Sequence, residues 1–159
     1  MVAFTLNGAA VALDVPEDAS LLHALRGPGG LSGPRFGCGT ENCGTCMVLV
    51  DGAPAYACTL AAGAAAGRRV TTVEGLGTPG RPHALQTAFL AEQAGQCGYC
   101  LSGILVSAAA LLARDPDPDE AAIRAALDPH LCRCGSHNRI IRAVRRAAAA
   151  MREAAAVPA

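Results

Sequence analysis

The sequence predicts an α+β protein with a β-rich first half and a helical second half. Short apolar runs separated by Asn-Gly and Asp-Gly turns dominate the chain before residue 75. Ala- and Leu-rich runs with helical spacing dominate it after residue 82. The Gly/Pro-rich segment 75–82 separates the two regions, so we expect one domain over residues 1–76 and a second over residues 77–159.

The first half contains five candidate strands and one short helix. The strands are expected at residues 2–6, 11–15, 47–50, 55–60 and 69–73. Asn7-Gly8 and Asp51-Gly52 have the residues of two-residue hairpin turns, so they predict antiparallel pairs. Ser20 precedes a short apolar run and predicts the N-cap of a helix over residues 21–26.

The second half is expected to form four helices. They are predicted at residues 83–94, 101–113, 119–127 and 139–151. An Asp-Pro-Asp-Pro break at residues 115–118 separates the second from the third. Four short helices rich in alanine predict a small bundle.

The composition excludes several classes of protein. The 159 residues are 52% hydrophobic, which supports a packed core and argues against disorder. Thirteen basic and 13 acidic residues give a net charge of zero, which argues against a nucleic-acid partner. No secretory signal and no transmembrane segment is visible, so a cytoplasmic protein is expected, with a periplasmic or membrane-associated location through a partner as the alternative.

Eight cysteines in a chain without a secretory signal favour metal ligation over disulfides. The first group has the spacing C-x4-C-x2-C-x11-C and consists of Cys38, Cys43, Cys46 and Cys58. Its first three members match the plant-type [2Fe–2S] run. Glycines around them allow a tight loop whose N–H groups point at sulfur. A zinc site is the alternative, but zinc typically takes its thiolates from two separate short pairs.

The second group consists of Cys97, Cys100, Cys132 and Cys134. Cys100 precedes one predicted helix and Cys134 precedes another, and helix N-termini stabilise negative charge. A C-x2-C pair also occurs in zinc sites and redox dithiols. From these residues alone, an iron–sulfur cluster and a zinc site both remain open.

Four motifs in order resemble the small iron–sulfur subunits of xanthine dehydrogenase-type molybdenum hydroxylases. The motifs are Phe-Gly-Cys-Gly-Thr-Glu-Asn-Cys-Gly-Thr-Cys at 36–46, Ala-Cys-Thr-Leu at 57–60, Gln-Cys-Gly-Tyr-Cys at 96–100 and Leu-Cys-Arg-Cys-Gly at 131–135. The sequence is similar to the small subunits of isoquinoline 1-oxidoreductase, nicotinate dehydrogenase and related aldehyde dehydrogenases from residue 4 to about residue 146.

The resemblance implies a β-grasp [2Fe–2S] ferredoxin domain followed by a four-helix-bundle [2Fe–2S] domain. It also implies a large partner that binds a molybdopterin cofactor and the substrate. Electrons would reach the cluster of the helical domain first, then the N-terminal cluster, and leave to a flavin subunit or a c-type cytochrome. By the same resemblance, Gln96 and Cys134 would lie beside the pterin.

Two other hypotheses are a free-standing two-cluster ferredoxin-like carrier and a zinc-stapled interaction module. No nucleophile–base constellation is visible, so the chain is expected to act as an oxidoreductase only within a complex. Glu41 departs from the family motif and is expected to face solvent. Tyr99 is expected to pack over a cluster, and the four histidines to lie at the surface or at an interface.

Overall fold

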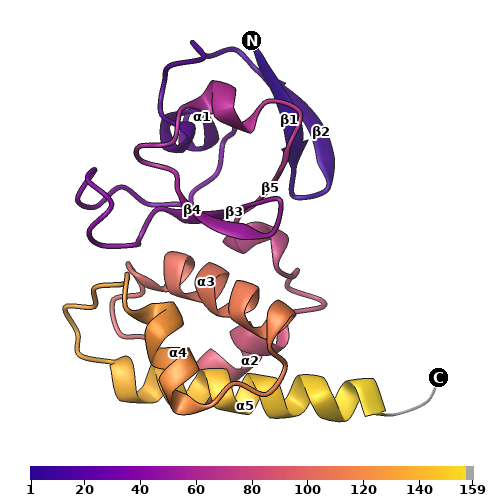
Figure 1. The fold of residues 1–159 in the computed structure, drawn as a ribbon, viewed down its shortest axis with the longest axis vertical. Coiled ribbons are helices and arrows are strands. Elements are labelled where there is room, and N and C mark those ends of the chain that lie inside the picture. The colour runs from indigo at the N-terminus through magenta and orange to yellow at the C-terminus, as the bar shows by residue number, and fades with distance from the viewer. Residues whose placement is uncertain (157–159) are drawn as a thin grey trace.

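A computed structural model describes residues 1–156 as a sheet-containing upper unit packed on a helical lower unit (Figure 1). The upper unit contains the strands β1 (Val2–Leu6), β2 (Ala9–Leu13), β3 (Met47–Val50), β4 (Ala53–Tyr56) and β5 (Arg69–Thr71), and the helix α1 (Leu21–Arg26). The lower unit contains α2 (Ala84–Ala91), α3 (Leu101–Arg114), α4 (Glu120–Leu127) and α5 (His137–Ala156). Short 3-10 turns occur at Ala62–Ala65 and Val73–Gly75. The α+β prediction is confirmed.

The sheet has five strands in the order β2-β1-β5-β3-β4. β1 and β5 are parallel and the other pairs are antiparallel. The helix α1 buries Leu21, Leu22 and Leu25 in the same core as Val2 and Val48 of the sheet. This arrangement of one helix on a mixed sheet is the β-grasp fold that the resemblance implies.

Local turn chemistry explains where the strands begin and end. Asn7 and Gly8 have φ values of 50° and 88°, so β2 begins directly after them rather than at residue 11. Asp51 and Gly52 form the second such turn, and β4 follows it at once. β4 ends at Tyr56, earlier than predicted, and it is an edge strand, which accommodates its proline. Ser20 caps α1 as predicted, since its hydroxyl accepts the N–H of His23 at 3.2 Å.

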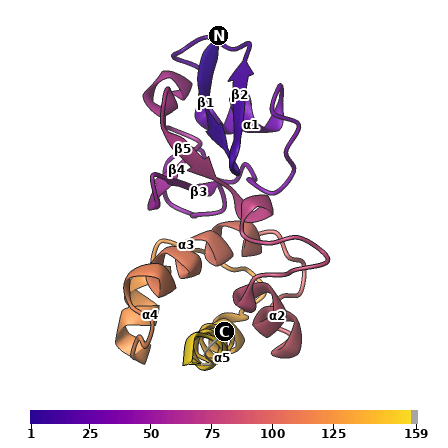
Figure 2. The same cartoon turned by 90° about the vertical axis from the view of Figure 1, so that its right-hand side faces the viewer.

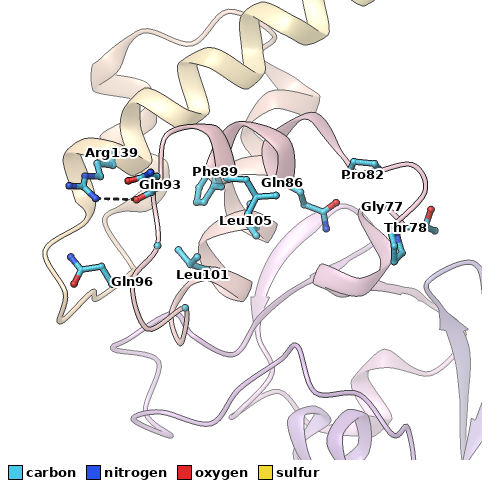
Figure 3. A pocket seen from close by; sticks show the side chains of 14 residues that line it. Gly77, Thr78, Pro82, Gln86, Phe89, Gln93, Gln96, Leu101, Leu105 and Arg139 are labelled. Carbon is cyan, nitrogen blue, oxygen red and sulfur yellow. Dashed lines mark hydrogen bonds between the residues drawn. The ribbon is translucent and has the colours of Figure 1, made fainter.

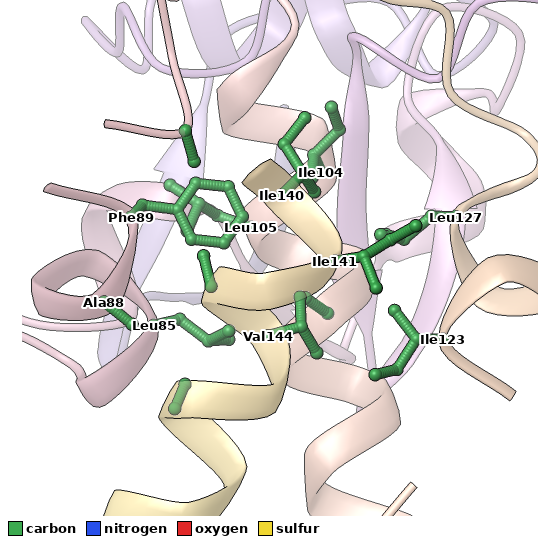
Figure 4. Close-up of a cluster of buried hydrophobic side chains, with 14 of the residues drawn as sticks. Leu85, Ala88, Phe89, Ile104, Leu105, Ile123, Leu127, Ile140, Ile141 and Val144 are labelled. Carbon is green, nitrogen blue, oxygen red and sulfur yellow. The ribbon is translucent and has the colours of Figure 1, made fainter. Parts of the chain in front are cut away.

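The four helices of the lower unit share one apolar core (Figure 4). Leu85 and Phe89 of α2 meet Ile104 of α3 and Ile140 and Val144 of α5 there. Burying a side chain of this size stabilises the folded state by roughly 1.5–3 kcal/mol, so a core of this kind holds the small bundle together.

The two units meet where α3 lies under the sheet (Figure 1, Figure 2). Met47 and Leu49 of β3 form a separate apolar cluster with Val106 and Ala110 of α3. The contact brings the first turn of α3 beneath the loop that precedes β3. Within residues 1–156, no helix is long and apolar enough to cross a membrane.

Candidate metal centres

The first cysteine group lies at one end of the sheet. Cys38, Cys43 and Cys46 come from the loop between α1 and β3, and Cys58 follows β4. The loop points backbone N–H groups at sulfur: Thr40 and Asn42 donate to Cys38 Sγ at 3.4 and 3.2 Å. A loop of this kind stabilises thiolates and tunes a cluster bound to them.

The thiols of this group have opposite electrostatic surroundings. The N–H of Thr40 lowers the pKa of Cys38 to about 6, together with the N–H of Asn42. Burial raises the pKa of Cys46 to about 12, because that thiol is only 2% exposed. A metal must therefore displace the proton of Cys46, whereas Cys38 loses its proton readily.

The loop leaves no room for larger residues beside its sulfurs. A Cβ on Gly37 would lie 2.7 Å from Cys43 Sγ. The N–H of Cys38 also donates to Cys43 Sγ at 3.3 Å. Four thiols, several N–H donors directed at sulfur and a close-fitting glycine are the surroundings that a [2Fe–2S] cluster requires, so these residues fit that group.

The second cysteine group lies between two helix starts. All four thiols line one small cavity together with Gln96, Gly98 and Ser136; they are Cys97, Cys100, Cys132 and Cys134. Cys100 is the N-cap of α3, and Cys134 comes shortly before α5, as predicted. Cys134 Sγ lies 3.5 Å from Cys97 Sγ, and the N–H of Tyr99 donates to Cys97 Sγ at 3.5 Å.

Backbone donors act on this second group as well. The N–H of Tyr99 lowers the pKa of Cys97. Burial acts to raise the pKa of Cys132, but backbone N–H groups, that of Ser136 first among them, outweigh it and lower the pKa. Burial raises the pKa of Cys100 to about 12. Four convergent thiols at two helix N-termini also fit a cluster that carries negative charge.

Among residues 1–156, no group of three or more Cys, His, Asp or Glu side chains is spaced to hold one metal ion. A [2Fe–2S] cluster differs from a single ion, because its four thiolates are divided between two irons.

Gln96 lies at the rim of the second group. Its side-chain N–H donates to the carbonyl of Cys134 at 3.2 Å, so the two residues that the resemblance assigns to the pterin lie together. Gln96 also lines an open groove of about 980 Å³ beside α2 (Figure 3). The groove is largely apolar, with Phe89, Leu101 and Leu105 in its wall, and Leu90 at its rim is 80% exposed.

The two cysteine groups are in direct contact through the backbone. The N–H of Leu131, next to Cys132, donates to the carbonyl of Cys43 at 3.1 Å. Gly103 of α3 packs so closely on the first loop that a Cβ there would lie 2.0 Å from the carbonyl oxygen of Gly44.

His130 fills the space beside this contact. It is 3% exposed, its Nε2 lies 2.7 Å from Ser107 Oγ, and a Cβ on Gly44 would lie 2.3 Å from its Nδ1. Burial lowers the pKa of His130 to about 4. His130 was expected at the surface or at an interface, but it lies buried within the chain between the first cysteine loop and α3.

Glu41 and Tyr99 had expected surroundings, and Arg35 had none. Glu41 faces solvent as predicted, and its carboxylate accepts the hydroxyl of Thr59. Tyr99, expected to pack over a cluster, instead has a half-exposed side chain whose hydroxyl donates to the carbonyl of Phe36. Arg35, which no sequence motif singles out, donates to the carbonyl of Gly98. Its position three residues before Cys38 carries no signal that could have revealed this contact.

These features define a protein with two [2Fe–2S] centres, one in each unit. Comparison with known proteins agrees: residues 4–69 match the 2Fe-2S iron-sulfur cluster binding domain, and residues 72–145 match the [2Fe-2S] binding domain. The chain belongs to the family of small [2Fe–2S] subunits of xanthine dehydrogenase-type molybdenum hydroxylases.

Several relatives cover nearly the whole chain. A nicotinate dehydrogenase subunit of Pseudomonas putida is 47% identical, over 96% of this chain and 97% of its own. The alpha subunit of isoquinoline 1-oxidoreductase from Brevundimonas diminuta is 48% identical, over 93% and 97%. The crystal structure of quinoline 2-oxidoreductase from Pseudomonas putida 86 superposes with a TM-score of 0.90 and 37% identity, over 96% of this chain and 95% of that one. The chain is therefore an electron-transfer subunit of a multi-subunit oxidoreductase.

Proposed function

We propose that this chain relays electrons from a molybdopterin site on a large partner subunit to a flavin subunit or a c-type cytochrome. The observation that carries the proposal is the pair of four-thiol groups in backbone contact, of which the second lies beside an open apolar groove. The substrate site belongs to the partner.

The ligand assignment follows from the two groups. The N-terminal cluster would be held by Cys38, Cys43, Cys46 and Cys58. The cluster of the helical unit would be held by Cys97, Cys100, Cys132 and Cys134. Each cluster, when bound, accepts and passes on single electrons. The division of the chain into domains over residues 1–76 and 77–159 stays a prediction.

The chain's own contribution is to bring the two ligand sets together. The hydrogen bond from Leu131 to the carbonyl of Cys43 connects a neighbour of one ligand directly to another ligand. Gly103 and Gly44, which approach each other closely beside this contact, are both buried. A short connection of this kind suits transfer between two centres.

The helical unit would face the large partner. The groove beside α2 and the second cysteine group share Gly95, Gln96 and Leu101 in their walls, so a partner seated in the groove would also cover Gln96 and Cys134. An exposed leucine at the rim of a mostly apolar groove is typical of a covered surface. We therefore place the molybdopterin cofactor, bound mainly by the partner, against Gln96 and Cys134.

The N-terminal unit would face the acceptor. Cys38 is exposed, so its cluster would lie close to solvent. Eight cysteines assigned to clusters rather than to disulfides suit a reducing compartment, and we place the protein in the cytoplasm.

The test is the metal content and EPR spectrum of the native complex. We expect about four irons and four sulfides per chain, co-purifying molybdenum, and two EPR signals that appear on adding an oxidisable N-heterocycle or aldehyde. Two clusters without molybdenum or any large partner would support a free-standing carrier instead. Zinc without sulfide would exclude electron transfer.

A further inference from the structure

Side chains connect the two cysteine loops in addition to the backbone contact. Arg35 Nη1, from the first loop, donates to the carbonyl of Gly98 at 2.6 Å. The hydroxyl of Tyr99 donates in the opposite direction, to the carbonyl of Phe36 at 2.5 Å. Thr45 Oγ1 donates to the carbonyl of Tyr99 at 3.0 Å. Three hydrogen bonds therefore join residues 35–45, which carry Cys38 and Cys43, to residues 98–99, which lie between Cys97 and Cys100.

Arg35 and Tyr99 also contact each other. The guanidinium carbon lies 5.3 Å from the centre of the tyrosine ring, within the range of a cation–π interaction. Each of the two side chains thus bonds the loop of the other and stacks on the other. We call this pair the Arg35–Tyr99 clasp.

Burial does not explain where these side chains lie. Tyr99 is 51% exposed and Phe36, whose carbonyl it bonds, is 59% exposed. A tyrosine that served only as packing would have most of its side chain buried. Polar bonds across the two loops therefore hold the clasp in place.

The clasp complements the backbone contact. Leu131 with Cys43, and Gly103 with Gly44, hold the first loop at residues 43–44. The clasp holds the same loop at residues 35–36. The separation of the two ligand sets is therefore fixed at two places along the first loop.

We propose that Arg35 and Tyr99 are positioning residues that fix the distance between the two clusters. The proposal rests on the proposed function in one respect, namely that each cysteine group holds a [2Fe–2S] cluster. Electron transfer falls off steeply with distance, so loss of the clasp slows transfer between the centres while both centres stay intact.

The experiment measures the magnetic interaction between the two reduced clusters in the dithionite-reduced native complex. Tyr99→Phe removes one hydroxyl, and Arg35→Gln removes the guanidinium. Tyr56→Phe is the matched control for the first, because within residues 1–156 Tyr56 is hydrogen-bonded through its backbone and not through its hydroxyl. Arg114→Gln is the charge-matched control, since Arg114 is exposed at the far end of α3, roughly 20 Å from Cys100 by the helical rise.

Both clasp variants are expected to keep four irons per chain and both EPR signals. Their spin–spin splitting should be weaker than in the controls, and kcat should fall several-fold with KM unchanged, because the substrate binds elsewhere. Unchanged splitting in both variants would overturn the proposal. Loss of a cluster in Tyr99→Phe would overturn it too, because the hydroxyl would then serve cluster assembly. A native complex whose clusters stay oxidised with substrate but show the splitting with dithionite would refute the proposed function alone.

Discussion

Replacing Gly103 with alanine tests how closely α3 approaches the first cysteine loop. Intrinsic helix propensity alone would favour the variant, because alanine in a helix is more stable than glycine by up to about 1 kcal/mol. Sterics oppose it, since the new Cβ would lie 2.0 Å from the carbonyl oxygen of Gly44, and contacts below 3.0 Å are essentially never seen. The helix and the loop would have to separate by about 1 Å.

That separation is costly because the obstacle is backbone on both sides. The carbonyl of Gly44 already accepts the N–H of Met47 at 3.1 Å, so the loop cannot turn aside freely. Overpacking of this kind costs about 1–3 kcal/mol, and at the upper end it exceeds the gain in helix propensity by about 2 kcal/mol. In a chain of this size, 1 kcal/mol shifts the melting temperature by about 2–4 °C.

The assay is thermal melting of the holo complex, followed by the visible circular dichroism of the clusters. Gly103→Ala is expected to melt about 4–8 °C below the native complex. Gly80→Ala is the control, since a Cβ there meets no atom within 4 Å. A Gly103→Ala complex that melts at or above the native temperature would refute the close approach of α3 and the loop.

Three further predictions concern pH and the partner. Burial lowers the pKa of His83, whose neutral ring caps α2. The stability that His83 contributes is therefore present above pH 6.5 and is lost as pH falls toward the folded pKa. The melting temperature should drop more steeply from pH 7 to pH 5 than in His83→Asn, because asparagine caps the helix without titrating. Hydrogen bonds from Arg146 and from a second arginine of α5 lower the pKa of Glu92. Glu92→Gln should therefore destabilise the folded protein at pH 7 and have no effect on its stability once pH falls below that pKa. Equal losses of stability at both pH values would contradict the pairing. Leu90→Glu should weaken co-purification of the large subunit, whereas Thr87→Glu, exposed on the same helix outside the groove, should not.

Local chemistry made much of the fold predictable. Asn7-Gly8 and Asp51-Gly52 adopt the positive φ values that their residue types favour, and Ser20 caps the helix that follows it. The four later helices occur where apolar spacing predicted them, because their core face repeats along the chain. Strand ends were less predictable, since Tyr56 ends β4 where the chain must turn to present Cys58.

The contact between the two halves was not predictable from pattern. In the sequence, Gly103 is only a residue of low propensity inside a predicted helix. In the structure it is the point at which α3 meets the first loop. His130 and Arg35 belong to no motif, and their partners are 23 and 63 residues away in the chain. Tyr99 was expected to pack over a cluster, but its exposure and its bond to the other loop depend on tertiary contacts that no local pattern encodes.

The central claim is the order of the two centres, and ligand replacement tests it directly. Cys58→Ser and Cys132→Ser should each remove one cluster and leave the other. In the Cys58→Ser complex, substrate should still reduce the remaining cluster, which lies in the helical unit. In the Cys132→Ser complex, substrate should leave the N-terminal cluster oxidised, whereas dithionite should reduce it. The opposite order of the two clusters would follow if substrate rapidly reduced the N-terminal cluster in Cys132→Ser and failed to reduce the helical cluster in Cys58→Ser. That result would contradict electron entry through the helical unit.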